Sequence, residues 1–303
     1  MGWLELSIEV EQRSLSRVEA ALEDLEAASI TLLDAEDHPI LEPGPGETPL
    51  WPQVTVRALF HDHVDRIGLF DALQIMVPWL TPEKITARGV ADEDWTRVWM
   101  DTFQPMQFGR RTWIYPSTSE PPTDLDVDAA IVRLDPGLAF GTGTHPTTAL
   151  CLAWLDGLDL RGKTVLDFGC GSGILAIAAL KLGAARAIGI DNDPQAIVAS
   201  RDNAERNGVL EHFDLYLPDA VPAGLTADVV VANILAGALV ALQPTITAHC
   251  RPGAPLALSG VLANQADEVA AAYRDEFTDL GVTAQEDWVR IAGVRRGTAP
   301  VHD

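Results

Sequence analysis

The sequence of 303 residues is poor in cysteine, in basic residues and in long apolar runs. Its three cysteines, Cys151, Cys170 and Cys250, are odd in number and lack Cys-x-x-Cys spacing, which excludes a disulfide framework and a cysteine zinc site. The richest apolar stretch, residues 229–242, is shorter than the roughly 20 residues that a membrane-spanning helix needs. The amino-terminal segment has no basic region of the kind that opens a signal peptide. These absences predict a cytoplasmic protein without a membrane segment.

Basic residues are scarce beside acidic ones: 21 Lys and Arg against 44 Asp and Glu give a net charge of −23. A protein that grips a phosphate backbone needs a basic surface, so a direct nucleic-acid substrate is not expected. The chain has 7 basic and 20 acidic residues before Phe103, a net charge of −13, and 14 and 24 after it, a net charge of −10. An acidic surface either favours a basic protein partner or only keeps the protein in solution.

The hydrophobic pattern predicts two domains joined by a linker. Residues 1–91 follow the order strand, helix, strand, strand, helix, strand, which is typical of a ferredoxin-like unit. This unit has no evident catalytic cluster, and His61 and His63 lack a third metal ligand, so we expect no metal site and a role in substrate recognition. Residues 92–104 predict a linker helix that begins with acids. In residues 105–303 short apolar strands alternate with helices, which predicts a doubly wound, Rossmann-like α/β domain with a parallel sheet.

The expected strands are residues 3–10, 30–33, 54–59, 85–90, 113–115, 165–168, 187–190, 229–232 and 256–258, and the expected helices outside the linker are 15–25, 67–76, 173–182, 194–207 and a stretch between 232 and 256.

A glycine-rich turn follows the first core strand of the second domain. Residues 167–173 read Asp-Phe-Gly-Cys-Gly-Ser-Gly, so glycines alternate where the backbone must bend tightly and approach a ligand. The dinucleotide fingerprint would need a glycine at the position of Ile174, and Asp167 would repel a pyrophosphate. The turn, with Gly169 and Gly171, therefore favours a nucleoside without phosphates and with a cationic amino-acid end over NAD.

Acids follow the next predicted strand. Asp191 lies where this fold uses a carboxylate to accept hydrogen bonds from ribose hydroxyls. Asp193 directly precedes Pro194 and is suited to be the N-cap of the next helix. We therefore assign the ribose contact to Asp191.

These motifs resemble those of the class I S-adenosylmethionine-dependent methyltransferases. Two further segments make the resemblance specific. Residues 134–148 are rich in glycine and hydroxyl groups and precede the core, and residues 230–236 read Val-Val-Ala-Asn-Ile-Leu-Ala at the end of the fourth core strand. At that place amino-group methyltransferases carry an Asn-Pro-Pro-Tyr-like motif. Together with the domain order, these segments are similar to the ribosomal protein L11 methyltransferase family over nearly the whole chain.

The resemblance implies transfer of methyl groups from S-adenosyl-L-methionine to the α-amino group and lysine ε-amino groups of ribosomal protein L11, by a monomer. We expect Asn233, Ile234 and Leu235 to form the catalytic segment. Methyl transfer needs a neutral amine held in line with the methyl group, so we predict that Asn233 and backbone carbonyls near Ile234 orient the amine by accepting its N–H bonds. Ala236 replaces the aromatic ring of the related motif, which fits a flexible aliphatic amine. The expected cofactor-binding residues are Thr148, Gly169, Asp191 and Asn233, with Asp167 and Gly171 in the turn and Phe140 and Thr144 in a loop that closes over the cofactor.

Several alternatives remain open from the sequence. His145 is suited either to act as a base or to order the threonine-rich loop. The chain could also be a related enzyme for a small amine or another protein, or a non-catalytic ribosome-assembly binder that retains the cofactor fold. Ile174 and Asp167 disfavour a dehydrogenase.

Overall fold

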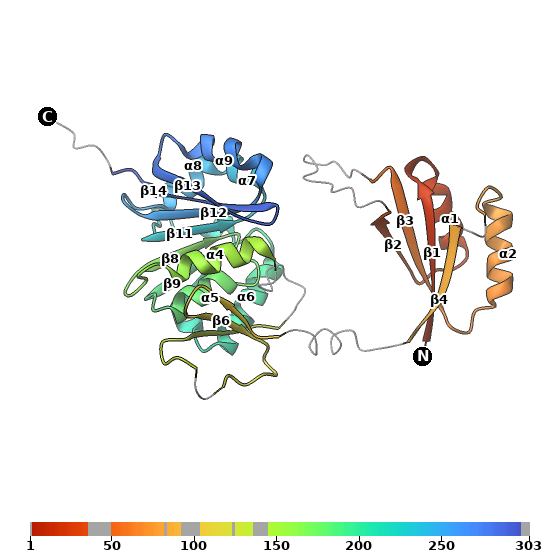
Figure 1. Ribbon diagram of the computed structural model, residues 1–303, viewed down its shortest axis with the longest axis horizontal. Coiled ribbons are helices and arrows are strands. Elements are labelled where there is room, and N and C mark those ends of the chain that lie inside the picture. The colour runs from red at the N-terminus through yellow and green to blue at the C-terminus, as the bar shows by residue number, and fades with distance from the viewer. Residues whose placement is uncertain are drawn as a thin grey trace. The chain divides into compact units, whose positions relative to one another are not determined.

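The computed structural model describes residues 2–35, 50–81, 84–91, 104–122, 125–135 and 145–297. The chain divides into two compact units, Met1–Trp95 and Thr96–Asp303 (Figure 1). Apart from Gln104, the predicted linker helix lies outside the described residues. No helix among the described residues is long and apolar enough to cross a membrane.

The described residues of the first unit form a four-stranded antiparallel sheet with two α-helices. The sheet order is β2-β3-β1-β4, as expected for the predicted ferredoxin-like unit. Its elements are β1 (Gly2–Glu11), α1 (Leu15–Asp24), β2 (Ser29–Asp34), β3 (Gln53–His61), α2 (Arg66–Met76) and β4 (Ile85–Ala91).

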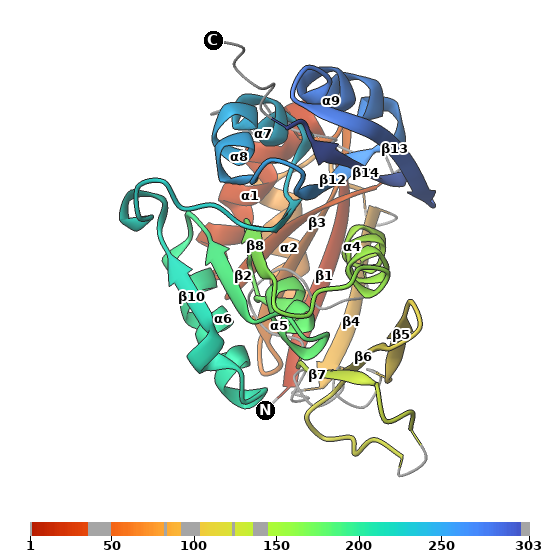
Figure 2. The same ribbon diagram turned by 90° about the vertical axis from the view of Figure 1, so that its left-hand side faces the viewer.

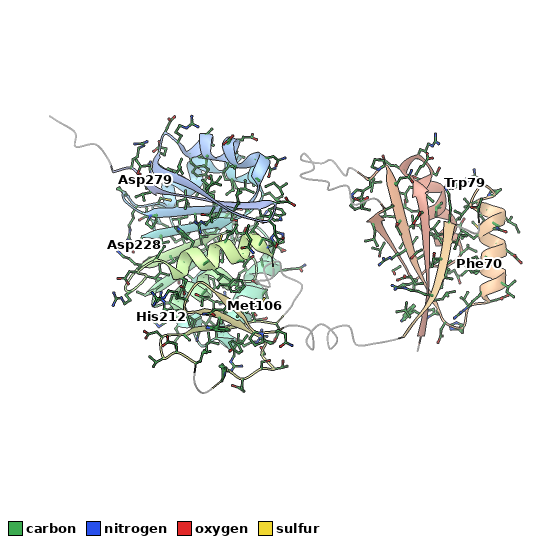
Figure 3. All side chains as sticks on the ribbon, viewed as in Figure 1. Phe70, Trp79, Met106, His212, Asp228 and Asp279 are labelled. Atoms are coloured by element: carbon green, nitrogen blue, oxygen red, sulfur yellow. The ribbon has the colours of Figure 1, made fainter. Side chains whose placement is uncertain are left out.

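Buried apolar side chains alternate along β1 and explain how this unit forms its core. Leu4, Leu6, Ile8 and Val10 are buried and join apolar side chains of α1 and α2 in a core that belongs to this unit alone. Figure 3 shows side chains filling the space between the sheet and the helices. This separate core means that the unit does not depend on the second unit for its hydrophobic contacts.

The histidine pair of this unit forms part of an aromatic stack. The ring of His61 lies 4.6 Å from that of Trp3 and 5.3 Å from that of His63. The described residues contain no group of three His, Cys, Asp or Glu side chains that could hold a metal ion.

The second unit is built on a seven-stranded sheet with the order β10-β9-β8-β11-β12-β14-β13, preceded by a small sheet of β5, β6 and β7. Its elements are β5 (Met106–Phe108), β6 (Thr112–Tyr115), β7 (Ala130–Arg133), α4 (Pro146–Asp156), β8 (Thr164–Phe168), α5 (Ile174–Lys181), β9 (Arg186–Ile190), α6 (Pro194–Arg206), β10 (Phe213–Tyr216), β11 (Val229–Asn233), α7 (Ala236–Ala241), α8 (Gln243–His249), β12 (Pro255–Leu262), α9 (Ala266–Tyr273), β13 (Phe277–Gln285) and β14 (Trp288–Arg295).

The expectation of a wholly parallel sheet is wrong at one edge. Strands β10, β9, β8, β11 and β12 are parallel, but β14 pairs antiparallel with β12, and β13 antiparallel with β14. The predicted strands and helices that fall on described residues are all present, whereas β5, β7, β10, α4, α9, β13 and β14 were not predicted. Most of β13 is exposed, so it lacks the apolar run that marks the parallel strands.

Helices cover both faces of the large sheet. Val165 and Val231 point to a core shared with α4, α5 and α6, whereas Leu166 and Val230 point to a second core shared with α7, α8 and α9. Figure 2 shows α7, α8 and α9 grouped together, away from α5 and α6. This doubly wound arrangement places the carboxyl ends of β8, β9 and β11 at one edge, where such folds bind ligands.

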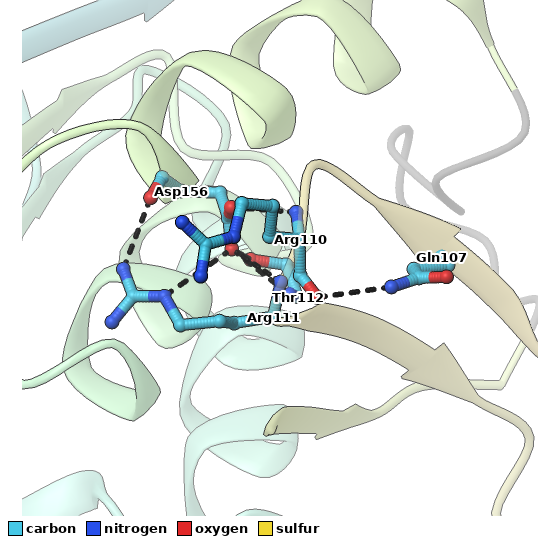
Figure 4. A network of polar contacts seen from close by, with 5 residues as sticks. All are labelled: Gln107, Arg110, Arg111, Thr112 and Asp156. Atoms are coloured by element: carbon cyan, nitrogen blue, oxygen red, sulfur yellow. Dashed lines mark hydrogen bonds and ion pairs between the residues drawn. The ribbon is translucent and has the colours of Figure 1, made fainter. Parts of the chain in front are cut away.

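Helix α4 ends in an aspartate that holds the turn between β5 and β6 (Figure 4). The Asp156 carboxylate accepts hydrogen bonds from the backbone N–H groups of Arg110 (2.7 Å), Arg111 (2.9 Å) and Thr112 (3.0 Å) and from the Thr112 hydroxyl (3.0 Å). Burial would raise the pKa of Asp156, but these bonds and the Arg111 charge together lower it below its usual value. Gly109 (φ 65°) permits the approach, since a Cβ there would lie 2.7 Å from that of Asp156.

Candidate active site

A cavity of about 1000 Å³ opens at the carboxyl ends of β8, β9 and β11. A second cavity of about 210 Å³ adjoins it at the glycine turn. Gly169, Asp191, Asn192, Asn233 and Ile234 line both. The topology therefore brings the glycine turn, the acid after the second core strand and the Asn-Ile-Leu segment to one place, as the sequence predicts.

The glycine turn needs its glycines for conformation and for space. Gly169, Gly171 and Gly173 have φ values of 77°, 53° and 77°, in the left-handed region that other residues rarely adopt. The N–H of Gly169 donates to the Ile190 carbonyl at 2.7 Å, which ties the turn to the end of β9. Gly173 then forms the N-cap of α5, so the first N–H groups of this helix lie directly after the turn.

The two acids after β9 have separate structural positions. Asp193 is the N-cap of α6, because its carboxylate accepts the Gln195 N–H at 2.8 Å. Asp191 lines both cavities and accepts N–H bonds from Gly171 at 2.8 Å and from Asp193 at 3.0 Å. A carboxylate has about four acceptor sites, so Asp191 retains acceptor capacity for two hydroxyl groups.

Asp167 lies beneath the turn and lines neither cavity. It is 1% exposed; one carboxyl oxygen accepts the Ala176 N–H at 3.2 Å, and the other has no hydrogen-bond partner. Burial, together with the nearby Asp191 charge, raises the pKa of Asp167 to about 8, against the opposing effect of the Ala176 hydrogen bond. The carboxyl group therefore binds the first turn of α5, and a direct cofactor contact by Asp167 stays a prediction.

The Asn-Ile-Leu segment follows β11 and lies beside the glycine turn, which follows the neighbouring strand β8. The Asn233 side-chain nitrogen donates to the Thr148 hydroxyl at 3.4 Å, which brings Thr148 of α4 next to the segment. With that nitrogen engaged, the amide oxygen is the atom of Asn233 that can accept an N–H. Leu235 is 59% exposed and lines the larger cavity, while Thr148 and Gly171 line the smaller one.

His145 begins α4 at the rim of the larger cavity. Its Nδ1 accepts the Thr147 N–H at 3.4 Å as the helix N-cap, and its ring lies edge-on to Trp288 at 4.7 Å. Burial lowers the pKa of His145, against the opposing effect of Glu286, so the ring is neutral near pH 7. These contacts favour the interpretation that His145 orders the start of the helix.

Sequence reasoning missed much of the lining of the larger cavity, including Trp288 and Gly260. Nothing in the local sequence links Trp288 to the site, because it reaches the cavity through the antiparallel strand β14. An isolated glycine in a strand signals a bulge or a close backbone approach, so Gly260 could have been found. Phe140 and Thr144, expected to close over the cofactor, lie outside the described residues.

The described residues fit a nucleoside cofactor with a cationic amino-acid end. Neither cavity has a described Lys or Arg in its lining. The glycines of the turn have no side chains, so a ligand can approach the backbone there closely. Asp191 lines the same two cavities, and its carboxylate can accept further hydrogen bonds. Gly169, Gly171 and Asp191 would hold such a group, which supplies a methyl group activated on a sulfonium.

A doubly wound sheet with this turn, this acid and an Asn-Ile-Leu segment after the fourth core strand defines a class I methyltransferase. The family model described as "Ribosomal protein L11 methyltransferase (PrmA)" matches residues 2–296. The chain belongs to the ribosomal protein L11 methyltransferase family.

Individual relatives agree with this membership. Ribosomal protein L11 methyltransferases of Pectobacterium carotovorum subsp. carotovorum (strain PC1) and Pseudomonas aeruginosa (strain LESB58) are each 55% identical over 298 residues, covering 98% of this chain and 100% and 99% of theirs. The crystal structure of a ribosomal protein L11 methylase from Lactobacillus delbrueckii subsp. bulgaricus matches with a TM-score of 0.56 and 31% identity, over 64% of this chain and all of that one.

Proposed function

We propose that the protein transfers methyl groups from S-adenosylmethionine to the α-amino group and lysine ε-amino groups of ribosomal protein L11. The Asn233 side chain is the observation that supports an amine as the methyl acceptor. Its nitrogen donates to the Thr148 hydroxyl, and its oxygen can accept a hydrogen bond beside the glycine turn. An amine approaching this point can donate N–H bonds to Asn233 and to the backbone near Ile234. The site residues named above remain part of this proposal.

The chemistry asks these residues to position a neutral amine. A lysine with a pKa of about 10.4 must lose a proton at a cost of about 4.6 kcal/mol at pH 7, whereas an α-amine with a pKa near 8 costs about 1.4 kcal/mol. Desolvation in the apolar cavity lowers the pKa of an ammonium group, and a neighbouring positive charge lowers it further. Asn233 then holds the lone pair in line for transfer, since its oxygen accepts the amine's remaining N–H.

The two-unit organisation supports a protein substrate. Met1–Trp95 forms a compact unit with its own core. We assign this acidic unit to recognition of L11, and we take the protein to act as a cytoplasmic monomer without a direct nucleic-acid substrate. The free state of all three cysteines is compatible with a reducing compartment.

Mass spectrometry of purified L11 after incubation with the protein and methyl-labelled cofactor tests the proposal. We expect label on the α-amine and on lysine side chains, and none without cofactor. L11 acetylated at its amino terminus is the matched control, because it should retain only the lysine label. Label confined to small amines would support an enzyme with a different substrate, and cofactor binding without transfer would support a non-catalytic binder.

A further inference from the structure

Strand β12 contains a bulge next to the catalytic segment. Its pairing with β14 shifts in register between Leu258 and Val261, so Ser259 and Gly260 stand out of the regular ladder. The Ser259 hydroxyl donates to the Val289 carbonyl at 3.0 Å and is completely buried, which fixes the bulge to β14.

This bulge contacts the backbone of Ile234 closely. The Ile234 N–H donates to the Ser259 carbonyl at 3.1 Å. Gly260 has a φ of 83°, and a Cβ on it would lie 2.8 Å from the Ile234 carbonyl carbon, 3.1 Å from its nitrogen and closer still to its oxygen. These are backbone atoms, which no rotamer change can move away. Only a residue without a side chain fits here.

Gly169, which follows β8, packs against Ile234 on the side away from β12. A Cβ on Gly169 would overlap the Cγ2 of Ile234. Ile234 is therefore held by its side chain against the turn and by its backbone against the bulge. Asn233 precedes Ile234 directly, so these two contacts also fix the position of the Asn233 side-chain amide, which we propose orients the substrate amine.

We infer that Gly260 is a positioning residue for methyl transfer, which sets the place of the Asn233 amide and the Ile234 carbonyl. The inference rests on the function proposed above. In Gly260→Ala the backbone of residue 234 must move away from residue 260, and Asn233, which precedes it directly, moves with it. A misplacement of about 1 Å in a reacting geometry can cost about 100-fold in rate, so we expect kcat to fall about 10- to 100-fold.

Gly253 offers a matched control. Its φ is 80°, close to that of Gly260, but a Cβ on it meets nothing within 4 Å. It lies before β12, at the end of the strand away from the cavity. Gly253→Ala therefore carries the same left-handed strain without the collision, and we expect its kcat to stay within about twofold of wild type.

The experiment compares wild type, Gly253→Ala, Gly260→Ala, Asn233→Ala and the double variant Gly260→Ala with Asn233→Ala. The readouts are kcat on L11, affinity for S-adenosylhomocysteine by calorimetry, and hydrogen exchange of the Ile234 amide. If Gly260 acts through Asn233, the double variant is no slower than Asn233→Ala by more than about threefold. The Ile234 amide should exchange faster in Gly260→Ala than in Gly253→Ala.

Two results would overturn the inference: a kcat for Gly260→Ala equal to that of Gly253→Ala, or losses that multiply in the double variant. If Gly260→Ala does not fold, Gly260→Asn replaces it, because asparagine tolerates positive φ better while keeping the colliding Cβ. A wild-type protein that leaves L11 unlabelled would refute the proposed function instead. The amide exchange rates would then still decide whether Gly260 holds Ile234.

Discussion

The carboxylate of Asp191 accepts the backbone N–H of Gly171 at 2.8 Å, and this bond joins the end of β9 to the middle of the glycine turn. One side chain thus shapes the turn and faces the cavity. Asp193, two residues on, faces away into the cap of α6. Within a single loop, the side chain that we propose to bind the cofactor and the side chain that caps a helix are therefore different residues.

Asp191→Ala should weaken S-adenosylmethionine binding about 10- to 100-fold. A hydrogen bond to a charged group contributes about 1.5–3 kcal/mol, and about 1.4 kcal/mol corresponds to a tenfold change in affinity. Asp193→Ala is the control, because it should lower the free energy of unfolding by about 1 kcal/mol through loss of the cap and leave affinity within about twofold. Calorimetry and thermal unfolding measure the two effects. Equal loss of affinity in both variants would contradict the assignment of the ribose contact to Asp191.

Asn233→Ala should lower kcat more than it lowers cofactor affinity, since we propose that its oxygen orients the amine. Thr148→Val should show a smaller loss of the same kind, because the hydroxyl that accepts from Asn233 is removed while the shape of the side chain is kept. Thr148→Ser keeps the hydroxyl and should stay close to wild type. Steady-state kinetics with L11 separate these effects. Equal losses of kcat and of cofactor affinity in Asn233→Ala would show that Asn233 only binds the cofactor.

The sequence predicted the parallel half of the fold and its edge motifs well, because buried strands such as β8 and β11 carry continuous apolar runs. Asp193 was recognisable as a cap from the following proline. Trp288 and the β12 bulge escaped prediction for a different reason. The bulge meets the Asn-Ile-Leu segment through the pairing of β11 with β12, and Trp288 is brought to the cavity by the pairing of β14 with β12. Strand order is set by tertiary packing, which no local pattern encodes.

Asp167 should make the stability of the second unit depend on pH. Its pKa in the folded protein is about 8, whereas an unfolded aspartate has a pKa of about 3.9. Between these values the folded state binds more protons, so this contribution is fully present below pH 4 and is lost as pH rises toward and through 8. Asp167→Asn removes the titration, and its thermal midpoint should fall less than that of wild type between pH 5 and 8. Equal slopes in both proteins would mean that Asp167 is ionised when folded.

Asp156→Asn should destabilise the second unit by about 3 kcal/mol at pH 7, because an amide cannot accept all the N–H groups that converge on this carboxylate. The lowered pKa of Asp156 means that its contribution is present above about pH 4 and is lost as pH falls through the folded value. The variant should therefore show a weaker acid dependence than wild type.

Asp159→Asn is the control for this change. Asp159 pairs with Arg161 at the surface, where water and salt screen the interaction, and its replacement should leave the unfolding midpoint unchanged. Urea titrations at several pH values compare the two variants. A midpoint for Asp156→Asn equal to that of Asp159→Asn would show that the network in Figure 4 adds nothing to stability.

The acidic first unit should direct L11 to the active site. A fragment of residues 105–303 keeps both hydrophobic clusters of the second unit, so we expect it to fold and bind cofactor with unchanged affinity. Its kcat/KM on L11 should fall at least tenfold relative to the full chain. The kcat/KM that remains should depend less on salt than that of the full chain. Charge interactions decay over about 10 Å at 0.1 M salt and about 3 Å at 1 M, so added salt should slow the full chain toward the rate of the fragment. A fragment that methylates L11 as fast as the full chain would show that recognition lies in the second unit.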